Sequence, residues 1–257
     1  MDLKISTLTL EAFLLVVVRT GCFIAVAPIF GHKSVNAKLR VLIAICLSFT
    51  TFSVLDITMP EYYTVLDYTL LVIKEALCGL SLGFVSSLVM AVISFAGEFI
   101  DREIGFSMVT NFNPSMGTMV TITAELYDKL VCLVIMVTNL HYYILKALAQ
   151  SFVLVPIGDV DFNFPVIYSD VVSFISQYFS IGIRIAMPIF IGVTMLNVIL
   201  GVLAKSAPQM NMFAIGIQLK LIVGMLILTI AILFIPNITE FVMDRMQTML
   251  SAMLGGL

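Results

Sequence analysis

The chain has 257 residues, of which 61% are hydrophobic and only 11% are charged, and its mean hydropathy is +1.13. A water-soluble domain carries roughly 25% charged residues, so this chain has too little polar surface to cover a globule in water. Its net charge of −3 gives no basic surface for nucleic acid. These values predict an all-α integral membrane protein, and no polar linker divides the chain into further domains.

Six apolar segments along the chain are long enough, or nearly long enough, to cross a bilayer as helices. A spanning helix needs about 20 mostly apolar residues. The segments cover about 8–30, 41–58, 68–98, 130–154, 174–204 and 216–236. The third and fifth exceed the length of one span, and Pro188 can kink the fifth. A short amphipathic helix follows at about 237–254, and its four regularly spaced methionines favour core or interface packing.

The connections between these segments differ in charge. The first contains Lys33, Lys38 and Arg40, and basic residues also occur in or beside the third and fifth. The second and fourth contain acidic residues and no Lys or Arg. By the positive-inside rule, the odd-numbered connections face the cytoplasm during insertion and both termini lie on the other side.

Six charged side chains lie within or at the edges of the apolar segments. Each costs about 2.5–3.5 kcal/mol at the centre of a membrane helix unless it finds a partner or water. Two interpretations remain open: a polar interface or aqueous conduit, or ion pairs and snorkelling within the chain. A GxxxG motif at Gly79 and Gly83 predicts close helix packing without identifying the partner. The six charges are Glu11, Arg19, Lys74, Glu75, Lys146 and Arg184.

The sequence contains no pattern typical of a catalytic or metal site. It has two histidines, no HExxH motif, no glycine-rich phosphate-binding loop and no GxSxG motif. The four cysteines form no CxxC pair and are expected to be buried free thiols. Acidic residues at Glu98, Asp101 and Glu103 are expected to form a solvated or interfacial patch. We therefore expect no enzyme, no catalytic residue, no metal and no cofactor.

Two segments interrupt the helical pattern. In residues 105–119, glycine and proline should prevent a helix, yet the segment is rich in Phe and Met. Irregular apolar backbone is tolerated at membrane depth only when buried in protein or lining a cavity, which favours a re-entrant or plugging loop. An interfacial loop packed on its own helices is the alternative. The candidate gating residues are Gly105, Phe106, Met108, Phe112, Asn113, Pro114, Met116, Gly117 and Met119.

The second interruption, residues 205–216, reads KSAPQMNMFAIG. From spacing alone it is a helix–helix turn, but it is similar to the A-P-Q-x-N-x-F-x-x-G signature of the FliR family of flagellar biosynthesis proteins. The matching residues are Ala207, Pro208, Gln209, Asn211, Phe213 and Gly216. The stretches 19–31 and 74–84 also resemble this family, whose injectisome counterparts form the SctT family. Asn113, where many relatives have Asp, and Gln218, where Pro is frequent, depart from the family pattern.

The resemblance implies a single-copy subunit of a protein export gate. Its partners would be several FliP and FliQ subunits, FlhB and FlhA, in the inner membrane at the flagellar basal body. Residues 1–173 would be a FliP-like portion and 174–257 a FliQ-like helical hairpin. Loop 105–119 would close the pore through which unfolded flagellar subunits cross. An injectisome gate subunit and, from another class, a small-solute secondary transporter are the alternatives.

Overall fold

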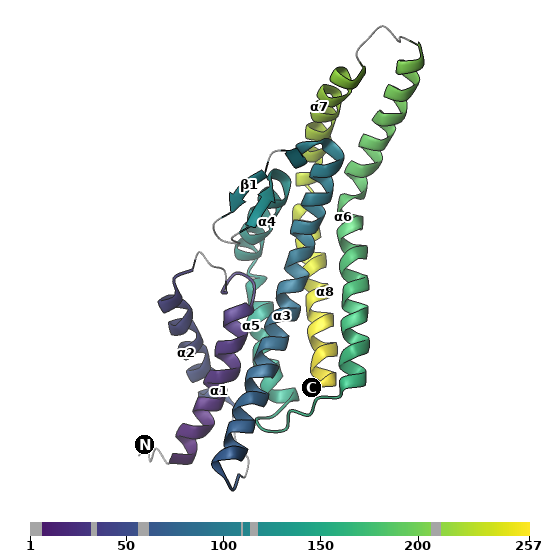
Figure 1. Cartoon of the computed structure of the whole chain (residues 1–257). Helices are drawn as coiled ribbons and strands as arrows, with labels where there is room; N and C mark the ends of the chain where they lie inside the picture. The colour runs from purple at the N-terminus through teal and green to yellow at the C-terminus, as the bar shows by residue number, and fades with distance from the viewer. Residues whose placement is uncertain (1–6, 32–34, 56–61, 109, 114–117, 207–211) are drawn as a thin grey trace. The chain divides into compact units, whose positions relative to one another are not determined.

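A computed structural model describes the backbone of residues 7–31, 35–55, 62–108, 110–113, 118–206 and 212–257. Eight α-helices make up nearly all of this part of the chain, so the all-α prediction is confirmed (Figure 1). They are α1 (Thr7–Val26), α2 (Ala37–Val54), α3 (Val65–Ile104), α4 (Ile122–Val137), α5 (His141–Leu154), α6 (Phe164–Ser206), α7 (Met212–Ile232) and α8 (Ile235–Gly256).

Five of these helices are long and apolar enough to cross a membrane, and α4 with α5 can form a sixth, broken span. The predicted excess length of two segments is confirmed, because α3 has 40 residues and α6 has 43. At about 1.5 Å per residue, each measures roughly 60 Å, about twice the hydrocarbon thickness of a bilayer. Helix α6 continues through Pro188.

The predicted apolar segment at 130–154 is broken into parts of two helices. Helix α4 ends at Val137, and α5 begins at His141. Asn139 takes a left-handed backbone conformation (φ 59°), which Asn tolerates better than most residues. The Thr138 N–H donates to the Val134 carbonyl at 2.9 Å and closes the last turn of α4. A local polar pair therefore stops a helix that composition alone would extend.

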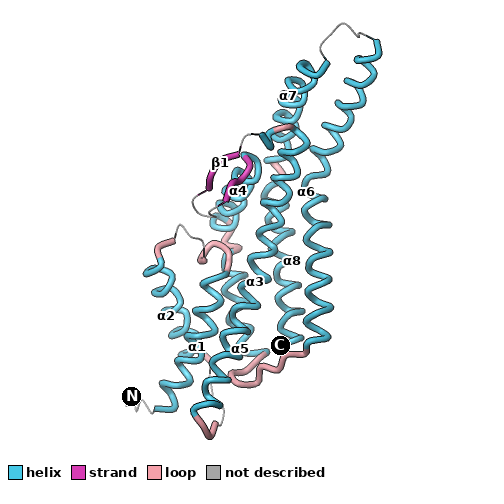
Figure 2. Tube along the Cα trace, in the orientation of Figure 1, coloured by secondary structure: helices cyan, strands magenta, loops and turns pink. Residues whose placement is uncertain are grey.

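The described residues between Gly105 and Thr121 form no α-helix. A short 3-10 turn, η1 (Phe106–Met108), precedes strands β1 (Thr110–Asn113) and β2 (Thr118–Thr121). The strands pair antiparallel, with Phe112 opposite Met119 and Asn113 opposite Thr118 (Figure 2). Glycine and proline correctly predicted a break in the helices, but strand pairing was not predicted.

The chain forms two compact units. The first contains Met1–Val89, Leu140–Phe174 and Met243–Leu257, and the second contains Met90–Asn139 and Ile175–Val242. Leu15, Phe23 and Leu82 are among the buried side chains of the first unit. The four regularly spaced methionines of α8 are also buried, so they are core residues: Met243, Met246, Met249 and Met253. Ile100, Ile135 and Ile189 belong to the core of the second unit.

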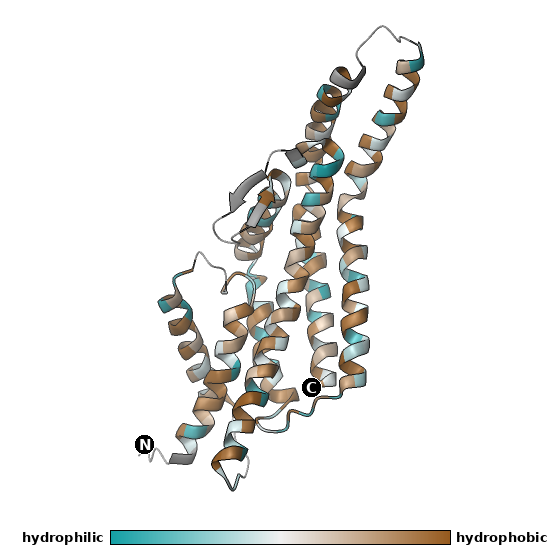
Figure 3. Cartoon of the chain, viewed as in Figure 1, coloured by the Kyte–Doolittle hydropathy of each residue, from teal (hydrophilic) through white to brown (hydrophobic). Residues whose placement is uncertain are grey.

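Large hydrophobic side chains also remain on the outside of the long helices. Hydrophobic residues run along most of α6 and α7 (Figure 3). Met195 is 64% exposed on α6, and Leu226 is 61% exposed on α7. Such surfaces require lipid or another protein as their environment. The cysteine prediction holds only in part, because Cys78 is buried whereas Cys46 is exposed.

Candidate functional site

The entrance of the 105–121 loop is a tight turn at the end of α3. Gly105 has a φ of +102°, a conformation that side chains with a Cβ rarely adopt. Its N–H donates to the Asp101 carbonyl at 2.9 Å, which closes the last turn of the helix. The chain then leaves α3 through η1. Glycine at this position therefore lets the loop begin immediately after a long rigid helix.

The exit of the same loop is fastened by the side chain of Asp101. One carboxylate oxygen accepts the Thr123 N–H at 2.8 Å, and the other accepts the Thr123 hydroxyl. Asp101 is 0% exposed and Thr123 is 1% exposed, so both bonds are shielded from water. The backbone carbonyl of Asp101 thus holds the start of the loop, and its side chain holds the end. Of the two predicted surroundings of Asp101, solvated or interfacial, the solvated one is wrong, because the first turn of α4 supplies donors that satisfy its buried carboxylate.

Close backbone packing supports this anchor. A Cβ added at Gly97 would lie 2.4 Å from the Ala124 Cα, so a larger residue would push α3 and α4 apart. Gly97 lies one turn before Asp101, and Ala124 directly follows Thr123. The two helices are therefore fixed in contact where the loop begins and ends. In the sequence, the only sign of this close packing is Gly97, a small residue four positions before Asp101.

The structure describes the candidate gating residues to different extents: some with their side chains, some by backbone alone and some not at all. Gly105 and Phe106 lie at the loop entrance, where Phe106 is half-buried. Met108, Phe112, Asn113 and Met119 have a described backbone in η1, β1 and β2, whereas their side chains lie outside the described part. Pro114, Met116 and Gly117 lie outside the described residues.

Most of the signature at 207–216 lies outside the described residues as well. This applies to Ala207, Pro208, Gln209 and Asn211. Phe213 is in the first turn of α7, with only its backbone described. Gly216 is on α7 facing α6, because an added Cβ would lie 3.5 Å from the Leu200 side chain.

A second cluster, in the first unit, joins two of the predicted intramembrane charges. The Arg19 Nε of α1 donates to the Glu75 Oε2 of α3 at 2.5 Å, and its Nη2 donates to Oε1 at 3.0 Å. Both side chains are 0% exposed. Such a two-point pair is the strongest geometry that a guanidinium and a carboxylate can form. Of the two interpretations of the buried charges, ion pairing within the chain therefore applies to these two.

Further contacts of the pair come from the end of α5 and from the loop that follows it. The Arg19 Nη1 donates to the Ser151 carbonyl at 3.0 Å and to the Val155 carbonyl at 2.8 Å. The Gly158 N–H donates to the Glu75 carboxylate at 3.1 Å, and the guanidinium lies 4.5 Å from the centre of the Phe152 ring. Arg19 thus donates to two carbonyls at the α5 C-terminus, where a positive charge is favoured.

The GxxxG motif lies against α1 beside this pair. A Cβ added at Gly79 would lie 2.2 Å from the Arg19 carbonyl oxygen, and one at Gly83 would lie 2.9 Å from the Phe23 carbonyl oxygen. The structure therefore gives α1 as the partner of this small-residue face, which the sequence left open. Close approach of the two backbones positions Arg19 within reach of Glu75.

The other four predicted charges have different surroundings. Glu11 accepts a hydrogen bond from the Tyr62 hydroxyl at 2.5 Å, and this carboxylate raises the pKa of Tyr62. Lys74 is half-buried, and Lys146 is exposed in a polar groove between α5 and α8. Arg184 is exposed and lies 5.9 Å from the centre of the Phe241 ring.

Comparison with known proteins decides the family. The family model described as "Bacterial export proteins, family 1" matches residues 10–246. The chain belongs to the FliR family of bacterial export proteins. The flagellar biosynthetic protein FliR of Bacillus subtilis (strain 168) is 30% identical over 93% of this chain and 95% of its own length. The protein of that name from Buchnera aphidicola subsp. Acyrthosiphon pisum is 31% identical over 88% of this chain and 87% of its own length. The one from Escherichia coli (strain K12) is 26% identical over 93% of this chain and 91% of its own length.

Membership of the family agrees with the chemistry of the site. Among the described residues, no group of three or more His, Cys, Asp or Glu side chains is arranged to hold a metal ion. The polar groups of the two clusters serve instead to fasten helices and the ends of a loop.

Proposed function

We propose that this chain is a membrane subunit of the flagellar protein export apparatus and that its 105–121 loop closes the export pore. The observation that carries the proposal is the anchor at Asp101, which fixes both ends of an apolar, non-helical loop in a membrane protein of the FliR family. A loop that is held at both ends can move aside and return to one resting position. Phe and Met side chains offer an adaptable apolar seal for unfolded substrates of varied sequence.

The proposed assembly is a gate in the bacterial inner membrane at the flagellar basal body. One copy of this chain would join several FliP and FliQ subunits, with FlhB and FlhA as further partners. Large exposed apolar side chains on α6 and α7 support such contacts, since they need lipid or protein around them. The division into a FliP-like portion (1–173) and a FliQ-like hairpin (174–257) is part of the same proposal.

An injectisome gate subunit and a small-solute transporter are less favoured. The relatives compared above carry the name flagellar biosynthetic protein and match nearly the whole chain. A secondary transporter typically has two matching halves with broken helices at corresponding positions. The breaks at 105–121 and 205–216 differ in residue types, which gives no support for such a repeat.

Co-purification tests the assembly. The tagged chain is expressed with the FliP and FliQ proteins of the same bacterium, extracted in detergent and weighed by native mass spectrometry. We expect one copy of this chain in a particle with several copies of each partner. A stable monomer or homodimer that ignores both partners would overturn the proposal.

Ion leakage tests the loop. Residues 106–120 are replaced by a short Gly–Ser linker in the assembled complex, which is reconstituted into vesicles. We expect faster ion efflux than from vesicles with the unaltered complex, because the apolar seal is gone. Equal ion efflux from the unaltered complex and the linker complex, both intact, would show that the loop does not close the pore. The proposal that the chain belongs to the export apparatus would not be affected.

A further inference from the structure

The second unit contains an apolar cavity, and none of its lining residues belongs to the 105–121 loop. It has a volume of about 370 Å³ and lies between α6 and the junction of α7 with α8. Its walls are mainly aliphatic and aromatic, with Ile185 and Pro188 on α6 and Ile227 and Ile230 on α7. A cavity of this size and lining is typical of a site for a small apolar group.

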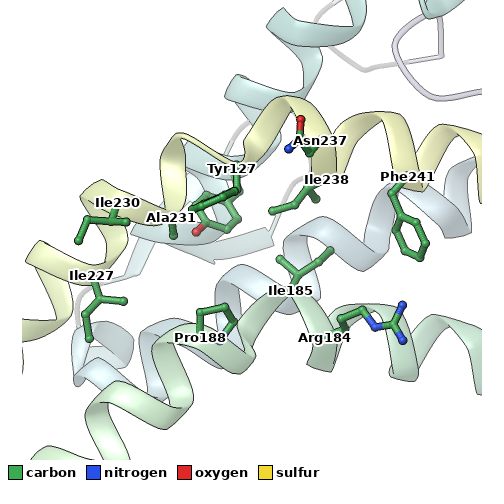
Figure 4. A pocket seen from close by; sticks show the side chains of 11 residues that line it. Tyr127, Arg184, Ile185, Pro188, Ile227, Ile230, Ala231, Asn237, Ile238 and Phe241 are labelled. Carbon is green, nitrogen blue, oxygen red and sulfur yellow. The ribbon is translucent and has the colours of Figure 1, made fainter.

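One end of the cavity is cationic. Figure 4 shows Arg184 and Phe241 together at one end and Ile227 at the other. The guanidinium lies 5.9 Å from the centre of the Phe241 ring, and among the described residues no carboxylate pairs with it. Arg184 is exposed, so its guanidinium donors are accessible to an anion at that end. The cavity combines an apolar interior with an entrance that suits an anion.

Proline adds an acceptor at the same place. Pro188 has no backbone N–H, so it cannot donate to the Arg184 carbonyl one turn earlier as another residue of α6 would. That carbonyl therefore lacks the helical donor that another residue at position 188 would supply. The cationic end thus offers both a donor fork and a carbonyl acceptor.

The charge pattern of the helices places this end at a membrane surface. Residues 185–204, between Arg184 and Lys205, contain no charged residue and are about as long as one membrane span. Residues 221–239, between Lys220 and Glu240, form a matching uncharged stretch in α7 and early α8. Lys205 and Lys220 mark one boundary of the bilayer, and Arg184 and Glu240 mark the other.

We propose that this cavity binds an anionic phospholipid. One acyl chain lies among Pro188, Ile227 and Ile230, and the phosphate lies at the Arg184 guanidinium, which is suited to two-point recognition of phosphate. A glycerol headgroup supplies hydroxyls for the Arg184 carbonyl. The proposal does not depend on the export role, since it concerns only the lipid held by this chain.

Native mass spectrometry of the purified full chain in detergent tests the site, with phosphatidylglycerol or phosphatidylcholine added in turn. We expect one phosphatidylglycerol to be retained in preference to phosphatidylcholine. Arg184→Gln should lower its retention by about tenfold, because a charge-assisted contact is lost. Arg184→Lys should give an intermediate value, since the charge stays and the fork is removed. Ala231→Phe should reduce retention of both lipids by filling the cavity.

Lys205→Gln is the matched control, because it removes a positive charge from the other end of the same uncharged stretch. It should leave phosphatidylglycerol retention unchanged. Equal retention of the two lipids by the wild type, or equal phosphatidylglycerol retention by the wild type and Arg184→Gln, would overturn the proposal. Loss of a co-purifying protein from Arg184→Gln with lipid retention unchanged would assign the surface to that protein instead. All variants are compared as monodisperse particles in size-exclusion chromatography, so that misfolding is recognised.

Discussion

The Arg19 guanidinium and the Glu75 carboxylate form a fully buried two-point ion pair between α1 and α3, although 56 positions separate them in the sequence. The two charges also meet the carbonyls at the end of α5 and the Gly158 N–H. Desolvation of each ion is costly, so the pair is stable only with all of these contacts in place. It therefore works as a fastener of three helices in the first unit.

Removal of one partner should be strongly destabilising. We expect Glu75→Gln to lower the free energy of unfolding by about 3–5 kcal/mol, because Arg19 then keeps a buried charge without a counterion. Thermal unfolding in detergent, followed by circular dichroism, measures the loss. The double variant Arg19→Met, Glu75→Leu should lose less unfolding free energy than the sum of the losses in Arg19→Met alone and Glu75→Leu alone. Additive losses would contradict coupling between the two side chains.

The sequence predicted those features that depend on local composition. Long apolar stretches are visible in any window, so α3 and α6 could be predicted with their excess length. The sequence also marked Arg19 and Glu75 as unusual charges. It could not pair them, because their contact depends on how α1 packs on α3. Asp101 looked like a surface acid for the same reason, since Thr123 reaches it only through tertiary packing.

The Gly79 contact gives a second prediction. Gly79→Ala should destabilise the first unit by about 1–3 kcal/mol, because the added Cβ would lie 2.2 Å from the Arg19 carbonyl oxygen and force α1 away. The same detergent unfolding assay applies. Gly21→Ala on α1 is the matched control, since nothing lies within 4 Å of its added Cβ. That control should be neutral or slightly stabilising, because alanine favours helix more than glycine. Equal effects of the two substitutions would refute close packing at Gly79.

The anchor of the 105–121 loop gives a third prediction. Thr123→Val removes one of the two donors to Asp101, and Asp101→Asn removes the charge that strengthens both bonds. We expect each to cost about 1–3 kcal/mol locally and to speed hydrogen–deuterium exchange in residues 106–121. Glu103→Gln, at a half-buried acid two positions away, is the control and should leave exchange in the loop unchanged. Similar exchange in all three variants and the wild type would show that the loop is held by other contacts.

A fourth prediction concerns the Tyr62–Glu11 hydrogen bond. The Glu11 carboxylate accepts a hydrogen bond from the Tyr62 hydroxyl and raises the pKa of this phenol above its ordinary value of 10.0. Well below pH 10.0 the tyrosine is protonated in both folded and unfolded chains, so the stabilisation is fully present. As the pH rises toward the higher folded pKa, the unfolded chain loses its proton first, and the stabilisation disappears. The stability advantage of the wild type over Tyr62→Phe should therefore be constant at neutral pH and vanish in strong alkali. Tyr63→Phe, at an 89% exposed neighbour, is the control, and identical pH profiles for the two variants would contradict the bond.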